Sequence, residues 1–292
     1  MSSVPNIDII DHKPLLSGLY LVATPIGNLR DITFRALDAL SNADIIACED
    51  TRHTARLLSF FGLKKKLYAY HDHSREEDRE RIIAMIREGK SVALVSDAGM
   101  PLISDPGYKL VQGCYDAGCM VTTLPGANAP LGALQLSGLP SDHFAFMGFF
   151  PPKKPDQIRV LEHTRVMAMT VIFFEGAKKV LKTLAVMRDI LGDDQPCAVV
   201  REMTKMYETV YRGNIADVLS SMQAEGEVKG EIVIILGPSL RDGRQHSDMD
   251  VDAMLLSASA QMAPKAAAKD VAQITGLAAG DLYKRLLLLR EK

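Results

Sequence analysis

The chain has 292 residues, 47% of them apolar, which is enough for two ordinary domains with separate cores. Its net charge of −2 excludes a bulk electrostatic attraction to nucleic acid or membranes, so such contacts would have to come from local patches. The 4 cysteines form no C-x-x-C pair, which predicts a reduced, cytoplasmic protein without a metal site. Residues 1–16 lack the apolar segment of a signal peptide and predict a disordered leader, and no stretch is long enough to span a membrane.

The first half of the chain, residues 17–126, alternates apolar runs with amphipathic helices. The runs at 19–23, 44–47, 67–70, 92–95 and 120–124 predict strands. Thr33 can cap the helix that follows it, and Gly62 can end the next one. Strand and helix in alternation predict an α/β domain built on a parallel sheet.

Polar residues follow each of these strands, at the edge where open α/β sheets bind ligands. The loop at 96–107 is the richest: Ser96 and Asp97 follow a buried strand, and Gly99 lets a ligand approach the backbone. Asp105 has two interpretations, because it could contact a ligand or cap a helix with Pro106 in its first turn.

Residues 127–240 predict a second α/β domain. Its expected strands lie at 170–174, 197–200, 206–211 and 231–236, with an aromatic strand and loop from Phe144. Residues 241–250 read as a linker. The tail at 251–292 predicts three helices, the second starting at Pro264. It resembles a helix-turn-helix, although a bundle used for packing or dimerisation fits equally well.

Several common catalytic motifs are absent from the sequence. There is no G-x-G-x-x-G, P-loop, H-E-x-x-H or G-x-S-x-G, which argues against the usual nucleotide sites, zinc hydrolysis and acyl transfer. His71 and His73 could form a metal pair, but a polar loop that shapes the cleft or touches substrate is the favoured interpretation.

The ordered motifs resemble those of the tetrapyrrole (corrin/porphyrin) methylase superfamily, and in particular its RNA-methylating members. They are LYLVATPIGNLRDIT at 19–33, EDTR at 49–52, SDAGMPLISDPG at 96–107, LPG at 124–126, SGLP at 137–140, GFFPPK at 148–153 and REMTK at 201–205. The resemblance implies two α/β domains with S-adenosylmethionine in the cleft between them, a small helix-turn-helix-like C-terminal domain, and a homodimer. It implies 2′-O-methylation of a cytidine in the decoding region of small-subunit ribosomal RNA.

Methyl transfer from a sulfonium needs an acceptor oxygen in line with the methyl group and a group that removes the hydroxyl proton. Backbone carbonyls and neutral surroundings suit the positive sulfur better than lysine or arginine. Together with the resemblance, this predicts the following cofactor-binding residues: Pro25, Ile26, Ser96, Asp97, Ala98, Gly99, Pro101, Ile103, Ala127, Ala129, Phe174 and Glu175. The predicted substrate-binding residues are Asn28, Asp50, Arg52, His71 and Lys153.

The predicted catalytic residues are Lys205, Glu202 and Glu208. Lys205 could act as the base if its pKa were lowered, or it could bind phosphate while a glutamate holds it. Interdomain salt bridges are an equally good explanation for these charges and for Asp50 and Arg52. Two other functions remain open: methylation of a tetrapyrrole, and non-catalytic regulation through binding of nucleic acid.

Overall fold

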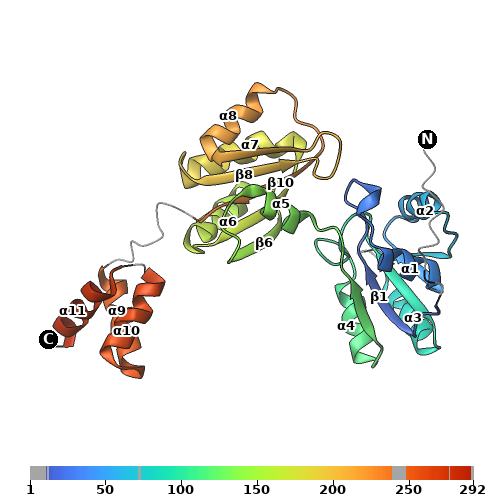
Figure 1. Ribbon diagram of the computed structural model, residues 1–292, viewed down its shortest axis with the longest axis horizontal. Coiled ribbons are helices and arrows are strands. Elements are labelled where there is room, and N and C mark those ends of the chain that lie inside the picture. Colours follow the sequence, from blue (N-terminus) through green and yellow to red (C-terminus); the bar gives the residue numbers. More distant parts are fainter. Residues whose placement is uncertain (1–10, 12, 72–73, 239–247, 276, 291–292) are drawn as a thin grey trace.

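A computed structural model describes residues 11, 13–71, 74–238, 248–275 and 277–290. Figure 1 shows two α/β units and, apart from both, a unit of three helices. Most of the predicted leader and of the predicted linker lies outside the described residues.

The first unit is built on a five-stranded parallel sheet, as predicted. Its strands have the order β3-β2-β4-β1-β5 and every pair is parallel. They are β1 (Gly18–Val22), β2 (Ile45–Cys48), β3 (Leu67–Ala69), β4 (Ser91–Val95) and β5 (Val121–Leu124). All five residues of β4 are buried, because β4 lies in the centre of the sheet with helices on both faces.

Helices cover the two faces of this sheet in pairs. Side chains of α1 (Phe34–Asn42) and α2 (Thr51–Phe60) share one core with the sheet, and those of α3 (Glu76–Arg87) and α4 (Tyr108–Asp116) share the other. The expected helix limits at Thr33 and Gly62 are confirmed: Thr33 Oγ1 accepts a hydrogen bond from Ala36 N (3.1 Å), and Gly62 follows α2 with φ 70°.

The capping role considered for Asp105 is wrong. Helix α4 begins at Tyr108, its N-cap residue is Gly107 with φ 133°, and no side chain caps it. A Cβ on Gly107 would lie 2.9 Å from Leu94 Cδ2, so the chain passes too close to the sheet here for a larger residue. Asp105 is therefore outside the helix.

The second unit contains a mixed sheet with the order β6-β7-β10-β8-β9. Only the pairing of β6 (Phe144–Phe149) with β7 (Thr170–Gly176) is parallel. The other strands are β8 (Pro196–Arg201), β9 (Thr209–Asn214) and β10 (Glu231–Leu236). One face packs on α5 (Ala129–Ser137), and the other on α6 (Lys154–Val166), α7 (Ala177–Leu191) and α8 (Ile215–Ala224).

Strand β9 starts three residues later than the predicted strand at 206–211. The preceding segment, residues 202–208, is a pair of turns in which Lys205 N donates to Glu202 O (3.0 Å) and Glu208 N donates to Lys205 O (3.2 Å). Glu202 and Thr204 have φ values of 51° and 66°, which lie outside the extended region of the backbone. We call residues 202–208 the 202–208 turn.

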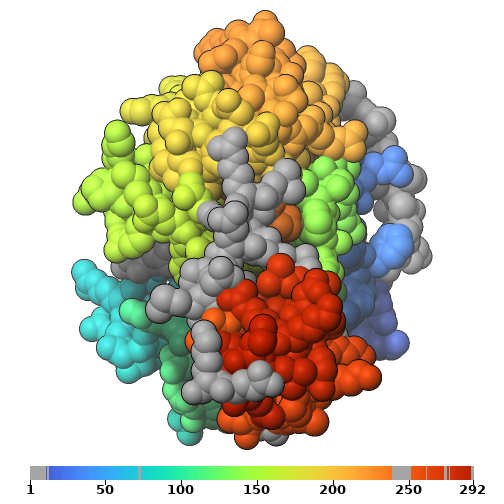
Figure 2. Space-filling model, turned by 90° about the vertical axis from the view of Figure 1, so that its left-hand side faces the viewer, coloured from blue at the N-terminus to red at the C-terminus, as the bar shows by residue number. Residues whose placement is uncertain are grey.

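The tail forms three helices around a small core of its own. They are α9 (Asp248–Gln261), α10 (Pro264–Thr275) and α11 (Ala279–Arg290), and α10 begins at the predicted Pro264. Leu255, Val271 and Leu286 are buried between them, and Arg285 Nε lies 2.6 Å from Asp252 Oδ1. In Figure 2 the red helical unit lies at the lower centre of the face, below the yellow and orange parts of the second unit. Within the described ranges, every helix is too short or too polar to cross a lipid bilayer.

Candidate functional site

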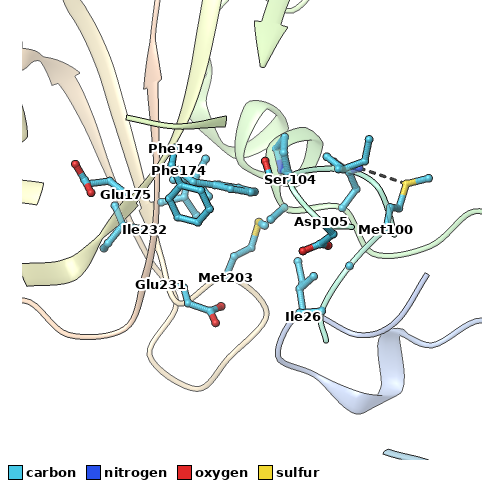
Figure 3. A pocket seen from close by; sticks show the side chains of 18 of the residues that line it. Ile26, Met100, Ser104, Asp105, Phe149, Phe174, Glu175, Met203, Glu231 and Ile232 are labelled. Carbon is cyan, nitrogen blue, oxygen red and sulfur yellow. Dashed lines mark hydrogen bonds between the residues drawn. The ribbon is translucent and has the colours of Figure 1, made fainter. Parts of the chain in front are cut away.

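A cavity of about 430 Å³ lies between the two α/β units, at the carboxyl ends of the first sheet. Figure 3 shows Phe149 and Phe174 on one side of it and Ile26, Met100 and Asp105 on the other. The first unit contributes the loops that follow β1 and β4, and the second contributes the start of α5 and residues from β6, β7, β8 and β10. The position agrees with the rule for ligands in open α/β sheets.

Hydrogen bonds between two loops of the first unit fix the floor of the cavity. Thr24 and Gly99 exchange backbone hydrogen bonds of 2.9 and 3.0 Å, and Thr24 Oγ1 donates to Ser96 O (3.2 Å). Gly99 has φ 79°, and a Cβ there would lie 3.3 Å from Ile26 Cγ2. Glycine is required at this position because both its backbone conformation and the space beside it disfavour a side chain.

The rest of the loop after β4 adopts an unusual backbone conformation. Leu102 and Ser104 have φ values of 73° and 65°, a region that costs a non-glycine residue about 1–3 kcal/mol. Ile103, Ser104 and Asp105 line the cavity. Strained backbone of this kind persists where the surrounding structure holds it, and here it brings three successive residues to the cavity.

Asp97 connects this floor to helix α2. Its Oδ1 accepts a hydrogen bond from Asp50 N (3.3 Å), and its side chain also lines the cavity. Asp50 caps α2 by accepting from Arg52 N (2.8 Å) and pairs with Arg52 Nη2 (2.8 Å), which holds the pKa of the Asp50 carboxyl well below its usual range. The ion pair of Asp50 and Arg52 is thus local to α2 and does not join the two units.

The second unit supplies an aromatic wall. The ring of Phe174 lies 5.4 Å from that of Phe149 and 4.8 Å from that of Phe146, both edge to face. Glu175 is buried next to it, where its two oxygens accept hydrogen bonds from Gly176 N (2.7 Å) and Thr183 Oγ1 (2.5 Å). These bonds fix the start of α7 and leave the carboxylate at the edge of the cavity.

Two of the predicted catalytic residues form a charged cluster beside the cavity. Lys205 Nζ lies 2.8 Å from Glu202 Oε1 and 3.0 Å from Glu231 Oε2. Burial alone would lower the pKa of Lys205, but its hydrogen bonds to the two carboxylates outweigh that and raise it. Burial would raise the pKa of Glu202, but the bonds from Lys205 and Glu231 N lower it. Lys205 is therefore a fixed cation at neutral pH.

The 202–208 turn contacts the first unit directly. Asn28 N donates a hydrogen bond to Thr204 Oγ1 (3.2 Å), and Gly27 lies so close that a Cβ there would be 2.5 Å from Lys205 Cγ. Glu208, the third predicted catalytic residue, accepts a hydrogen bond from Thr204 N (2.7 Å) and thereby stabilises the turn. The turn joins the two units through packing and a hydrogen bond rather than through an interdomain ion pair.

The structure brings two thirds of the predicted cofactor residues to the cavity wall. These are Ile26, Asp97, Ala98, Gly99, Ile103, Ala129, Phe174 and Glu175. The others, which are not among its described lining residues, are Pro25, Ser96, Pro101 and Ala127. Ser96 is buried and donates to the carbonyls of Ala98 and Gly99, so it holds the floor from behind.

The predicted substrate residues are spread around the cavity rather than gathered in it. Asn28 caps the short 3-10 helix Leu29–Asp31, and Lys153 is the exposed N-cap residue of α6. His71 is exposed after β3, with its backbone N–H bonded to Ser74 Oγ (2.8 Å). His73 lies outside the described residues, and no cluster of metal-ligating side chains occurs within the described part of the chain.

Sequence reasoning missed much of the wall from the second unit. The missed residues include Asn128, Phe149, Val200, Met203, Gly230, Glu231, Ile232 and Val233. The sequence offered one signal for this wall, the glycine at position 230 directly before an apolar strand. In the structure Gly230 has φ 96°, and its missing Cβ leaves room for the Glu202 side chain.

The cavity combines acidic and apolar surfaces. Asp97, Asp105, Glu175 and Glu231 line it, and none of its described lining residues is a lysine, arginine or histidine. The phenylalanines and methionines provide the apolar part. Such a site fits a cationic ligand that also carries a flat ring.

Comparison with known proteins identifies the class to which this fold and cavity belong. The chain belongs to the tetrapyrrole (corrin/porphyrin) methylases, whose family model matches residues 18–219. Residues 245–290 match the model of the RsmI C-terminal HTH domain, which favours the helix-turn-helix interpretation of the tail.

Within that class the chain is similar to curated proteins called Ribosomal RNA small subunit methyltransferase I. The one from Mesorhizobium japonicum is 44% identical over 97% of this chain and 95% of its own length. The one from Escherichia coli O157:H7 is 41% identical over 92% of this chain and 94% of its own length. A solved uroporphyrin-III C-methyltransferase from Thermus thermophilus, complexed with S-adenyl homocysteine, shares the fold (TM-score 0.53, 19% identity, 77% of this chain and 99% of that chain).

Proposed function

We propose that this protein transfers the methyl group of S-adenosylmethionine to the ribose 2′-hydroxyl of a cytidine in the decoding region of small-subunit ribosomal RNA. The observation that carries the proposal is identity above 40% to two small-subunit RNA methyltransferases over more than 90% of the chain. A tetrapyrrole acceptor is much less well supported, because the uroporphyrin enzyme is only 19% identical and resembles this chain in fold alone.

The residues around the cavity fit the proposed cofactor. The sulfonium and the amino group of S-adenosylmethionine are cationic. Four carboxylates line the cavity, and none of its described lining residues is a lysine, arginine or histidine, although Glu231 is paired with Lys205 from beside the cavity. Phe149 and Phe174 offer faces for the adenine ring. Ala98 is exposed at the cavity, and its backbone can hydrogen bond to the polar groups of the nucleoside.

The cofactor supplies a methyl group on a positive sulfur, and the protein supplies position and a dry environment. The two units close the cavity from opposite sides, and the 202–208 turn holds them together. The acceptor oxygen must lie in line with the methyl group, so we propose that this contact keeps acceptor and donor aligned.

Lys205 is better suited to holding this turn than to removing the proton of the hydroxyl. Its raised pKa keeps the ammonium charged at neutral pH, and a charged ammonium cannot accept a proton. We propose that Lys205 with Glu202 positions the turn, and that Glu208 supports it through Thr204 N.

The RNA partner requires positive surface in spite of the net charge of −2. Exposed cations occur at Lys153 on the second unit and at Lys265, Lys269 and Lys284 on the tail. We propose that the tail and this rim contact the RNA backbone. We also propose a homodimer, supported by exposed apolar side chains such as Met206 and Tyr207, and sedimentation equilibrium would measure its mass.

The test is methyl transfer with two alternative acceptors. The protein is incubated with methyl-labelled S-adenosylmethionine and either small ribosomal subunits that lack the modification or a reduced uroporphyrin. Label in the RNA and none in the pigment is the expected result. Label in the pigment would contradict the proposal, and so would failure to bind the cofactor at all.

A further inference from the structure

A second, smaller cavity of about 270 Å³ lies on the first unit next to the proposed cofactor cavity. One wall is formed by four residues of α2 that share a helical face: His53, Arg56, Leu57 and Phe60. The opposite wall is formed by Thr24, Pro25 and Leu29 from the loop after β1, together with Asp97. We call this cavity the α2 pocket.

The α2 pocket adjoins the larger cavity at two points. Asp97 lines both cavities. Pro25 lines the α2 pocket, and the next residue, Ile26, lines the larger cavity. The hydrogen bond from Asp50 N to Asp97 Oδ1 and the Thr24–Gly99 bridge fix the wall that they share. A ligand in the α2 pocket would therefore meet a ligand in the larger cavity across Asp97.

The chemistry of the α2 pocket differs from that of its neighbour. Phe60 is 45% exposed, although an isolated phenylalanine gains from burial. Arg56 and His53 are exposed as well, and within the described residues neither side chain makes a hydrogen bond or an ion pair. A single unstacked nucleotide is bound by nitrogen donors and by an aromatic face. Arg56 and His53 offer the donors, and Phe60 offers the face beside a mainly apolar pocket.

We propose that the α2 pocket receives the acceptor nucleotide of the RNA, with its base on the ring of Phe60 and its phosphate or the polar edge of its base on Arg56 and His53. This proposal rests on the proposed function and assigns the acceptor side of the same site. The nucleotide leaves the RNA stack, so that its ribose lies at Asp97 beside the methyl group.

The experiment compares single substitutions on α2 in the full-length protein. The variants are Phe60→Ala, Phe60→Tyr and Arg56→Ala. The control is Arg87→Ala, which removes an exposed charge from α3 of the same unit. Each variant is assayed for kcat and KM with small subunits lacking the modification, for the salt dependence of KM, and for the Kd of S-adenosylmethionine by calorimetry. Because Phe60 and Arg56 are exposed, the Tm of each variant should stay near that of the wild type.

Loss of the stacking ring in Phe60→Ala should lower kcat/KM about 10-fold, and Phe60→Tyr should restore it. Arg56→Ala should raise KM and reduce the slope of log KM against log salt by about 1, an effect that a structural role would not produce. Cofactor Kd and the Arg87→Ala control should stay as in the wild type. Wild-type kcat/KM in both Phe60→Ala and Arg56→Ala would overturn the proposal. A wild-type protein that methylates no RNA would overturn the proposed function itself.

Discussion

Replacing Gly27 with alanine tests the contact that joins the two α/β units. A Cβ on Gly27 would lie 2.5 Å from Lys205 Cγ and 2.8 Å from Thr204 Oγ1, both too close for real atoms. Neither neighbour can move freely. The Lys205 ammonium is held by two carboxylates at 2.8 and 3.0 Å, and Thr204 Oγ1 accepts the hydrogen bond from Asn28 N. The substitution must therefore separate the units or break these contacts.

The size of the effect follows from what is lost. Relieving an overpacked contact costs about 1–3 kcal/mol, and the hydrogen bond from Asn28 N contributes about 0.5–1.5 kcal/mol. If the substitution destabilises the closed arrangement by about 2 kcal/mol, cofactor binding should weaken roughly 30-fold, because each 1.4 kcal/mol changes a dissociation constant by a factor of about ten. Calorimetric titration with S-adenosylmethionine measures this directly.

Two further variants make the result specific. Gly280→Ala is the control, because a Cβ there meets nothing within 4 Å, and it should bind the cofactor as the wild type does. The double variant Gly27→Ala, Lys205→Ala should recover part of the lost affinity, because truncating the lysine makes room for the new methyl group. Wild-type affinity in Gly27→Ala would refute the reasoning and show that closure of the units does not depend on this contact.

Four other expectations follow from the structure. The pKa of Glu202 is lowered from 4.5, because its hydrogen bonds outweigh the effect of burial. The stability that the ionised carboxylate contributes is therefore complete above pH 4.5 and is lost as the pH falls below it. Glu202→Gln should make Tm depend less on pH in the acid range. Ellman's reagent should titrate Cys119 alone in the native protein at pH 8 and all four thiols in guanidinium, because burial raises the pKa of the other three, two of them to about 12. Asp97→Ala and Asp105→Ala should both weaken cofactor binding about 10-fold, and a change in Tm alone for Asp105→Ala would restore a structural role for that residue. Deleting residues 250–292 should raise KM for the ribosomal subunit and leave the cofactor Kd unchanged; unchanged RNA methylation would remove the tail from the interface.

The first unit was predictable because its apolar runs and the polar loops after them mark the strands and the strand ends. Runs such as Ser91–Val95 are buried on both faces of a parallel sheet and therefore read as continuous apolar segments that end in polar loops. The mixed order of the second sheet was not predictable, since an apolar run such as Glu231–Leu236 carries no information about strand direction. Packing between distant segments decides that direction.

The candidate site also contains residues that the sequence indicates and residues that it does not. Asp97 and Gly99 stand out because a carboxylate and a glycine lie within four residues of the end of a buried strand. Met203 and Ile232 look like ordinary core residues, and only the approach of the second unit brings them to the cavity. Asp105 was open to misreading because Asp-Pro commonly begins a helix, whereas the left-handed residues Leu102 and Ser104 turn the chain before α4 starts.

The most direct test of the account is the chemical position of the transferred methyl group. RNA labelled by the protein from methyl-labelled S-adenosylmethionine is hydrolysed with alkali, which cleaves next to every free 2′-hydroxyl. Methylation of one cytidine 2′-hydroxyl predicts that the label is recovered in a single alkali-resistant dinucleotide that begins with cytidine, and that subunits already carrying the modification accept none. Label recovered only in mononucleotides would place the methyl group on a base and contradict the account.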